Sequence, residues 1–193
     1  MTTTTIKTAS ASDEAGVLAV LTLAFGADPA TRWTWPSPDE YLQHFPIFAK
    51  LLAGKAFTTD TAYYADGFAG AALWLPPDVR PDDDALSALM WRTSAAPLED
   101  VSQVFEQMER HHPREPHWYL PFIGVDPTQQ GEGHGAALMT HALVHCDRDH
   151  APAYLESSNP KNIPLYERHG FTLLGTIQVG SSPPIFPMLR RPR

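Results

Sequence analysis

The sequence predicts an α/β fold in which helices cover both faces of a mixed β-sheet of about six to seven strands. The first observation is the nearly continuous apolar run 118–125, which is typical of a central strand covered on both faces. The second is a glycine-rich stretch, 126–135, that leads into a helical pattern at 136–146. The third is the succession of strand and helix patterns without an internal repeat or a linker, which favours one domain over residues 1–193.

Before the central strand, periodicity and turn residues predict four helices and three strands. Ser10 and Asp13 give a capping signal for the first helix, and Asp66-Gly67 lies between two β-rich runs, as in a hairpin. Pro46 is expected to kink or break the second helix. In chain order we expect a strand at 3–8, helices at 10–25 and 41–52, strands at 56–64 and 68–75, and helices at 85–91 and 97–110.

The central strand and the elements after it complete the expected sheet. Pro121 lacks an N–H group, so pairing along the central strand must lapse there, by a bulge or by separation of the strands. The helix at 136–146 has one apolar stripe that should pack on the sheet. Beyond it we expect a strand at 153–156, a helix at 163–169 and strands at 171–179 and 185–189.

Composition excludes several classes of protein. The net charge is −8 and no basic stripe stands out, so we expect no nucleic-acid partner. The apolar run 17–25 is too short to cross a membrane and follows acidic residues, so we expect neither a membrane span nor a secretory signal. The single cysteine, Cys146, fits a reducing cytoplasm, where we expect a monomer or a homodimer.

The glycine-rich stretch predicts an anion-binding loop. Gly131, Gly133 and Gly135 permit a tight backbone close to a ligand, and the following helix directs its positive end at the same turn. A dinucleotide fits Gly131-x-Gly133-x-x-Ala136, with Glu156 as a ribose contact, which keeps an NAD(P)-dependent oxidoreductase as an alternative. However, such a fingerprint normally opens a sheet, and here fewer than sixty residues follow it.

Two motifs resemble the GNAT acyltransferases. Gln130-x-x-Gly133-x-Gly135 resembles their acetyl-CoA pyrophosphate loop, and the run Asn162 to Phe171 resembles the next motif of that family. Residues 118–171 as a whole resemble the puromycin N-acetyltransferase group. The resemblance implies the GNAT fold and an acetyl-CoA-dependent N-acetyltransferase acting on a small amine. It also implies an acetyl-CoA-binding core at about 117–179 and acceptor-side elements at about 10–116.

The resemblance further implies which residues hold acetyl-CoA. Backbone N–H groups of the loop would bind the pyrophosphate, and the strand edge before it would bind the pantetheine, with Ile123 or Val125 N–H donating to the thioester oxygen. Asn162 could cap its helix, bind the pantetheine, or do both. The implied cofactor residues are Ile123, Gly124, Val125, Gln130, Gly131, Glu132, Gly133, His134, Gly135, Ala136, Asn162 and Tyr166.

The acid and the base of the reaction form a separate set. Tyr166 corresponds to the family tyrosine that protonates the departing thiolate, although it could instead be a core aromatic. Glu156 is the first candidate for the base, directly or through water, and His117 is the alternative. For the acceptor amine we expect contacts from Trp33, Trp35, Tyr119 and Glu156, although the tryptophans, in an expected loop at 31–36, could be plain core residues.

Metal and covalent chemistry are not expected. His141 and His145 have the spacing of a zinc pair, but the Glu of the His-Glu-x-x-His motif is missing. Cys146 lies on the apolar stripe of its helix, which favours a buried and unreactive thiol. We therefore expect direct transfer in a ternary complex, without a metal. A CoA-binding module without turnover is the non-enzymatic alternative.

Overall fold

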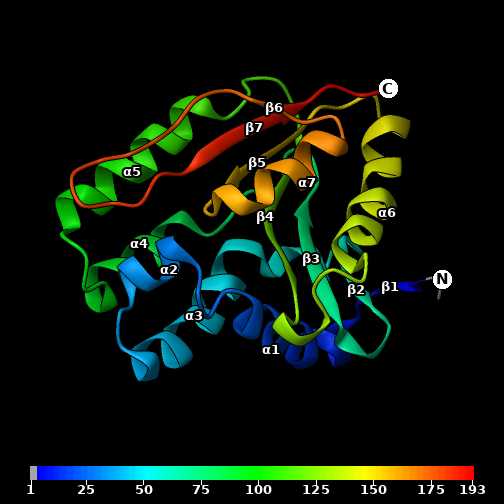
Figure 1. Cartoon of the computed structure of the whole chain (residues 1–193). Coiled ribbons are helices and arrows are strands. Elements are labelled where there is room, and N and C mark those ends of the chain that lie inside the picture. The colour runs from blue at the N-terminus through cyan, green and yellow to red at the C-terminus, as the bar shows by residue number, and fades with distance from the viewer. Residues whose placement is uncertain (1–3) are drawn as a thin grey trace.

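The computed structural model describes residues 4–193 and contains a seven-stranded sheet with the strand order β1-β2-β3-β4-β5-β7-β6 (Figure 1). Its strands are β1 Ile6–Thr8, β2 Ala62–Ala65, β3 Gly70–Leu75, β4 Trp118–Val125, β5 Ala153–Ser157, β6 Thr172–Leu173 and β7 Phe186–Arg190. Its α-helices are α1 Glu14–Ala24, α2 Pro29–Thr34, α3 Pro38–Ala53, α4 Asp83–Thr93, α5 Leu98–His111, α6 His134–Arg148 and α7 Ile163–Arg168.

The sheet is mixed, as predicted. Strands β1 to β4 pair antiparallel in sequence order, β4 and β5 pair parallel, and β7 pairs antiparallel with both β5 and β6. The expected hairpin joins β2 to β3, and Gly67 at its turn has φ +73°, a conformation that glycine adopts without strain.

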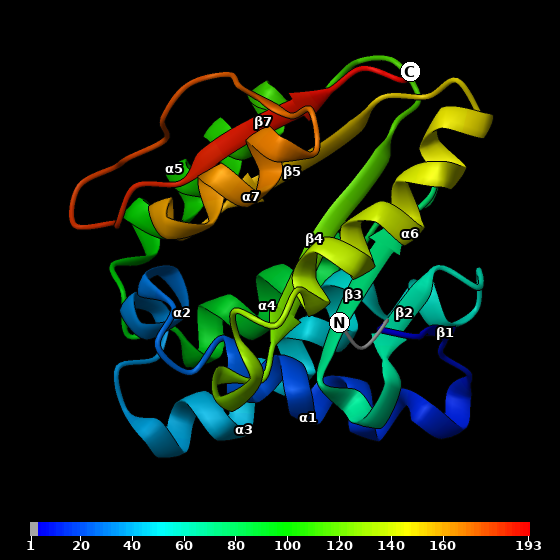
Figure 2. The same cartoon turned by 45° about the vertical axis from the view of Figure 1, so that its right-hand side comes forward.

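The β4–β5 pair separates soon after it begins. Their register has only two pairs, Trp118 with Ala153 and Tyr119 with Tyr154. Leu120 and Pro121 follow the last pair, and on the side of β4 that faces β3 the register is irregular between Leu73 and Leu75. Figures 1 and 2 both show β4 and β5 diverging from this point. The predicted lapse of pairing at Pro121 is therefore confirmed, and it opens the sheet between two central strands.

Helices cover both faces of the sheet, because side chains along each strand point alternately to opposite faces. Leu73 and Phe122 lie in the apolar cluster that includes α1 and α3, whereas Trp74 and Leu120 lie in the cluster that includes α6 and Tyr166 of α7. Figure 2 shows α1 and α3 on one side of the strands and α6 on the other. None of the helices formed by residues 4–193 is long and apolar enough to cross a membrane.

One prediction in the first third of the chain was wrong, and another was wrong in part. The expected loop at 31–36 is mostly helix α2, because Asp28 caps it with its side chain and Pro29 occupies its first turn. A break at Pro46 does not occur, since α3 continues through it. The buried face of α3, which includes Phe45 and Ala49, outweighs the one backbone hydrogen bond that proline removes.

Two expected strands have less than half of their predicted length, and Thr3 of the first strand lies outside the described residues. The strand expected at 56–64 begins only at Ala62, because the chain first makes a 3-10 turn at Gly54–Phe57. The strand expected at 171–179 is reduced to β6 and a single bridge at Ile177. The segment between the Ile177 bridge and β7 leaves the sheet. Within it, Ser181 donates hydrogen bonds to the carboxylate of Asp100 on α5.

Candidate active site

The glycine-rich loop between β4 and α6 presents a row of free backbone N–H groups. Gly131 and Gly133 have φ values of +86° and +93°, and Gly133 is the N-cap of α6. No backbone N–H from Gln130 to Ala136 has a hydrogen-bond acceptor among residues 4–193. These groups and the positive end of α6 therefore suit an anion such as a pyrophosphate.

The side chains of this loop are turned to other partners. His134 contacts the hydroxyl of Thr4 at 3.2 Å and the carboxylate of Glu132 at 3.6 Å. The side-chain amide of Gln130 donates to the carbonyl of Val125 over 3.4 Å. The loop thus offers its backbone rather than its side chains to a ligand.

At the end of β4, the three predicted cofactor residues differ in their surroundings. A Cβ atom on Gly124 would lie 2.5 Å from Cβ of Ala24, so this glycine allows α1 to approach the sheet closely. Ile123 and Val125 are half-buried. Ile123 also lines a small cavity of about 40 Å³ at the point where β4 and β5 separate.

This small cavity brings together the predicted residues of the second motif. Tyr166 of α7 lines it and is buried, and burial, followed by the charge of Asp28, raises the pKa of its phenol. Asn162 lines the same cavity, but its side chain makes no capping hydrogen bond to α7. The capping role considered for Asn162 is therefore wrong, because its backbone is already helical and is not in the extended conformation typical of an N-cap.

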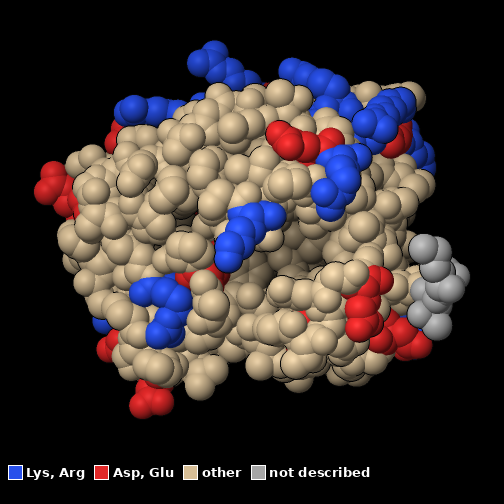
Figure 3. Space-filling view, viewed as in Figure 1, with Lys and Arg blue, Asp and Glu red and all other residues tan. Residues whose placement is uncertain are grey.

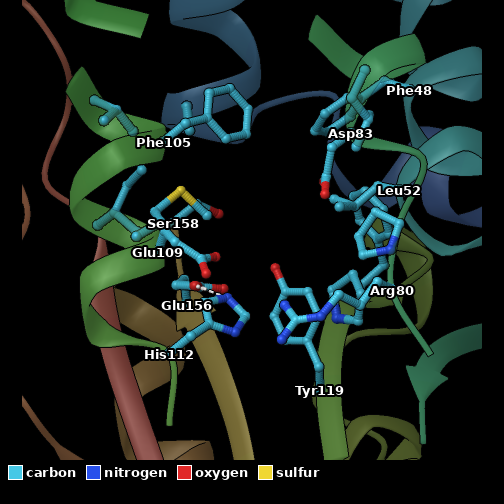
Figure 4. A pocket seen from close by; sticks show the side chains of 18 of the residues that line it. Phe48, Leu52, Arg80, Asp83, Phe105, Glu109, His112, Tyr119, Glu156 and Ser158 are labelled. Atoms are coloured by element: carbon cyan, nitrogen blue, oxygen red, sulfur yellow. Dashed lines mark ion pairs between the residues drawn. The ribbon is translucent and has the colours of Figure 1, made fainter. Parts of the chain in front are cut away.

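A second cavity, of about 330 Å³, opens beside the first one and has mainly apolar walls. Figure 4 shows Phe48, Leu52 and Phe105 around it, with the side chains of Asp83, Glu109 and Glu156 directed inward. Its walls come from α2, α3, α4, α5, β4, the end of β5 and the loops 76–81 and 182–185. No local pattern in the sequence indicated that these segments meet.

Glu156 of β5 lines both cavities. Its side chain is 4% exposed, and Oε1 lies 3.1 Å from Nε2 of His112 but off the N–H direction, so Oε1 has no hydrogen bond to any described residue. Tyr119 and Tyr154 pack against the ring of His112. Burial, followed by the charge of Glu156, raises the pKa of both tyrosines. Glu156 is thus a buried carboxylate with capacity for a further donor.

His117, the other candidate base, lies near Glu156 but does not touch it directly. Its Nε2 is 3.3 Å from Nδ1 of His112, and its Nδ1 is 2.8 Å from the carbonyl oxygen of Glu115. Burial lowers the pKa of His117. His112, the residue between the two predicted bases, was missed; the sequence indicated only that it ends α5.

The two tryptophans and Tyr119 all line the large cavity, but they differ in burial. Trp35 is almost fully buried, and its indole N–H donates to the hydroxyl of Thr93, so it is a core residue that also forms part of the wall. Trp33 is half-buried and donates to the hydroxyl of Ser181. Tyr119 directs its hydroxyl into the cavity (Figure 4).

Asp28 is a second buried carboxylate of the large cavity, and sequence reasoning missed it. Its side chain accepts from the N–H groups of Ala30 and Thr31 and from the hydroxyl of Ser158 at 2.5 Å. Burial raises the pKa of Asp28 despite these three donors. The Ser158 contact ties α2 to the end of β5 across the site.

The two cavities meet along a shared wall. Phe25, Pro121, Glu156 and Ser158 line both of them. Figure 3 shows a hollow in this face of the molecule between α7 and the start of α6, with positively charged side chains on the α7 side. The positive charge suits the phosphates of a nucleotide-like ligand.

Covalent and metal chemistry have little support among the described residues. Cys146 is buried, and burial raises the pKa of its thiol to about 12, so it is not an activated nucleophile. His141 and His145 pack their rings against Tyr63. Residues 4–193 contain no group of three or more His, Cys, Asp or Glu side chains that could hold a metal ion.

The dinucleotide alternative does not fit this topology. The dinucleotide fingerprint follows the first strand of a parallel sheet, at a switch point between parallel strands. Here the loop follows β4, which pairs antiparallel with β3 over most of its length and parallel with β5 over two residues only.

Comparison with known proteins finds similar acetyltransferases. An uncharacterized N-acetyltransferase of Schizosaccharomyces pombe is 25% identical over 215 aligned positions, which cover 96% of this chain and 83% of that protein. A crystal structure from Corynebacterium glutamicum, of a histone acetyltransferase HPA2 and related acetyltransferase, superposes with a TM-score of 0.71 at 26% identity. That alignment covers 100% of this chain and 98% of the other.

A polyamine N-acetyltransferase of Drosophila melanogaster, which catalyses the formation of N-acetylagmatine, shares the fold with a TM-score of 0.70. It is 14% identical, and the alignment covers 98% of this chain and 100% of that one. The model of the Acetyltransferase (GNAT) family, whose members use acetyl-CoA, matches residues 27–171. The chain therefore belongs to the Acetyltransferase (GNAT) family, has the GNAT fold and is an acyltransferase.

Proposed function

We propose that the chain transfers the acetyl group of acetyl-CoA to the amine of a small molecule, directly and within a ternary complex. The observation that carries this proposal is the meeting of the two cavities at Glu156. One cavity is lined by Tyr166, Asn162 and Ile123 of β4, and the other is large enough for an organic amine. Their junction is where an amine nitrogen and an acetyl group would meet.

Acetyl-CoA fits the first region, and it would supply the activated acetyl group. The free N–H groups from Gln130 to Ala136 would hold the pyrophosphate. Where β4 has lost its partner strand, Ile123 to Val125 would present backbone groups to the pantetheine amides, and the free side-chain amide of Asn162 could add a further contact. Ile123 or Val125 would donate its N–H to the thioester oxygen; one such donor stabilises a transition state by about 3 kcal/mol in other enzymes.

The proposed acid and base both line the small cavity, and only Glu156 also lines the large one. Glu156 would accept a proton from the bound ammonium ion, which must become neutral before it can attack. Tyr166 would hold a proton at its phenol oxygen beside the leaving sulfur. Its raised pKa makes the phenol a donor that keeps its proton until a strong base forms next to it.

The acceptor is proposed to be a cationic amine with an apolar body. Carboxylates of Asp28, Glu109 and Glu156 attract the ammonium group, while Trp33 and Phe105 offer contact to carbon. A polyamine acetyltransferase is among the structures with this fold, and residues 118–171 resemble the puromycin N-acetyltransferase group; both favour a small-molecule amine. The proposal places acetyl-CoA mainly on residues 117–179 and the acceptor mainly on residues 10–116, within one domain.

Two measurements test this function. Acetyl-CoA should raise the melting temperature, whereas NADPH should not. CoA thiol release across a panel of primary amines, read with a thiol reagent, should then reveal turnover. Glu156→Gln should lower kcat/KM about 100-fold at neutral pH, with Glu167→Gln, an exposed neighbour of Tyr166, as the matched control.

The outcomes separate the alternatives. Stabilisation by NADPH alone would overturn the proposal. Stabilisation by acetyl-CoA with no thiol release for any amine in the panel would leave a CoA-binding module without turnover. Undiminished turnover in Glu156→Gln would remove Glu156 as the proton acceptor.

A further inference from the structure

Three side chains that are distant in the sequence form one connected chain in the wall of the large cavity. Oε1 of Glu156 is 3.1 Å from Nε2 of His112, and Nδ1 of His112 is 3.3 Å from Nε2 of His117. Nδ1 of His117 is in turn 2.8 Å from the carbonyl oxygen of Glu115. Figure 4 shows the first of these contacts at the base of the cavity. The two residues considered separately as bases are thus the two ends of one chain, joined by His112.

The carbonyl at the far end fixes where the protons are. A carbonyl oxygen can only accept, so Nδ1 of neutral His117 carries the proton and Nε2 has a lone pair. His112 must then donate from Nδ1, which leaves its Nε2 without a proton while the ring is neutral. In this state neither Nε2 of His112 nor Oε1 of Glu156 carries a proton, and the two atoms lie 3.1 Å apart without a hydrogen bond. The pair is therefore arranged to take up one proton.

We propose that Glu156 and His112 accept the proton of the substrate ammonium ion as a pair, and that His117 keeps His112 in the tautomer that can receive it. This inference rests on the proposed function, because it assigns the destination of the amine proton in that reaction. Glu156 is the group that meets the substrate. His112 and His117 act through it, as positioning residues.

The proton balance of this step is complete within the protein and solvent. The N–H bond of the ammonium ion breaks, and its electron pair stays on nitrogen for the attack. The proton bonds to the carboxylate of Glu156 and then to Nε2 of His112, which becomes an imidazolium ion. Its Nδ1–H group donates to His117, and the charged ring forms an ion pair with Glu156 over 3.1 Å. The proton leaves to water when the product has left the open cavity.

The surroundings of His112 hold the ring in place for this role. The ring centroid lies 4.8 Å from that of Tyr119 and 4.4 Å from that of Tyr154. Because burial raises the pKa of both phenols, neither ionises below about pH 10. The titratable or charged groups that face the chain from the surrounding elements are Tyr119 of β4, Tyr154 of β5, Glu109 of α5, Glu115 before β4 and Arg80 before α4.

The experiment compares neighbouring histidines. His112→Phe keeps an aromatic ring between the tyrosines but removes both nitrogens, and His111→Phe is its matched control, since His111 only caps the carbonyl of Gln107. We expect His112→Phe to lower kcat/KM about 100-fold at pH 7. The loss should shrink to less than about tenfold near pH 9.5, because a primary amine with a pKa of about 10 then arrives increasingly neutral. His111→Phe should behave as the wild type.

The pH dependence distinguishes the proposed role from a packing role. If His112→Phe loses the same factor in kcat/KM at every pH, or loses none, the proposal is overturned. The proposed function still stands in that case, because the wild-type protein turns over. Wild-type protein that acetylates no amine would instead overturn the proposed function itself.

A second measurement does not depend on turnover. Nitrogen-15 NMR of the histidine rings in the free wild-type protein should show neutral His117 protonated on Nδ1. Protonation of neutral His117 on Nε2 would contradict the proposed series of contacts from Glu115 to Glu156.

Discussion

The two halves of the site are built in opposite ways. The half assigned to acetyl-CoA is centred on one continuous stretch, from the end of β4 to the first turn of α6, which presents mainly backbone groups. The half assigned to the acceptor is assembled from helices and loops between residues 25 and 185, and it presents side chains. A ligand common to a whole family can be recognised by backbone geometry, whereas an acceptor that differs among members requires side chains that can change independently.

The largest expected effect tests whether the first half depends on backbone geometry. Gly133→Val forces a β-branched residue to a φ of +93°, which costs roughly 3 kcal/mol. A loop that relaxes to avoid this strain instead loses about two N–H bonds to the pyrophosphate, each contributing about 2 kcal/mol because the acceptor is charged. We expect acetyl-CoA binding, measured by calorimetry, to weaken by about 1000-fold.

The hairpin glycine provides the control for that experiment. Gly67 has a φ of +73°, and, like Gly133, it has no neighbouring atom within 4 Å of the place that a Cβ atom would take. Gly67→Val should therefore lose similar stability in urea unfolding but bind acetyl-CoA as the wild type does. Equal binding in both variants would show that the loop does not hold the cofactor through its backbone.

The same difference explains which features could be predicted. The bounds of β4, and the start of α6 to within two residues, followed from local patterns, because strand, glycine turn and helix are adjacent in the sequence. The cavity did not, since the Asp28–Ser158 hydrogen bond joins residues 130 positions apart. Likewise, the sequence identifies His112 only as the end of α5, and its contact with Glu156 depends on the packing of α5 beside β5.

Tyr166→Phe should have the next largest effect, at the boundary between the two halves. The ring of Phe can keep the packing against Phe171, so the site loses only a hydroxyl group. We expect kcat to fall about 100-fold, as for loss of a general acid, with little change in the KM for acetyl-CoA. Steady-state kinetics at saturating amine measures this. A raised KM with kcat unchanged would show that the phenol binds the cofactor and does not act as the acid.

Filling the acceptor cavity should weaken amine binding without changing acetyl-CoA binding, and this effect should be smaller than that of Tyr166→Phe. Leu52→Trp places a larger side chain on the cavity wall formed by α3, far from the glycine-rich loop in the sequence. We expect the KM for bulky amines to rise about tenfold while the Kd for acetyl-CoA stays unchanged. Leu42→Trp, at an exposed position of the same helix, is the control. An unchanged KM in Leu52→Trp would place the acceptor elsewhere.

The smallest expected effect concerns Asp28, whose charge influences Tyr166 from the acceptor side. Its folded-state pKa is raised above 3.8, so above pH 3.8 the folded protein keeps a proton that the unfolded chain loses. The stabilisation from protonated Asp28 is therefore complete below pH 3.8 and is lost as the pH rises through the folded-state pKa. Asp28→Asn removes this titration, and its side-chain oxygen can still accept from Ala30 and Thr31.

We therefore expect Asp28→Asn to gain stability relative to the wild type as the pH rises above 3.8, by roughly 1 kcal/mol at most. Urea unfolding of both proteins from pH 4 to pH 8 measures the difference, in which carboxylates with lowered pKa values, such as Asp147, cancel because both proteins contain them. Asp28→Ala should be about 1 kcal/mol less stable than Asp28→Asn at every pH, since it also removes the cap of α2. A difference between Asn and Asp that does not vary with pH would mean that Asp28 is not desolvated, and the acceptor half would then be wetter and more open than its packing indicates.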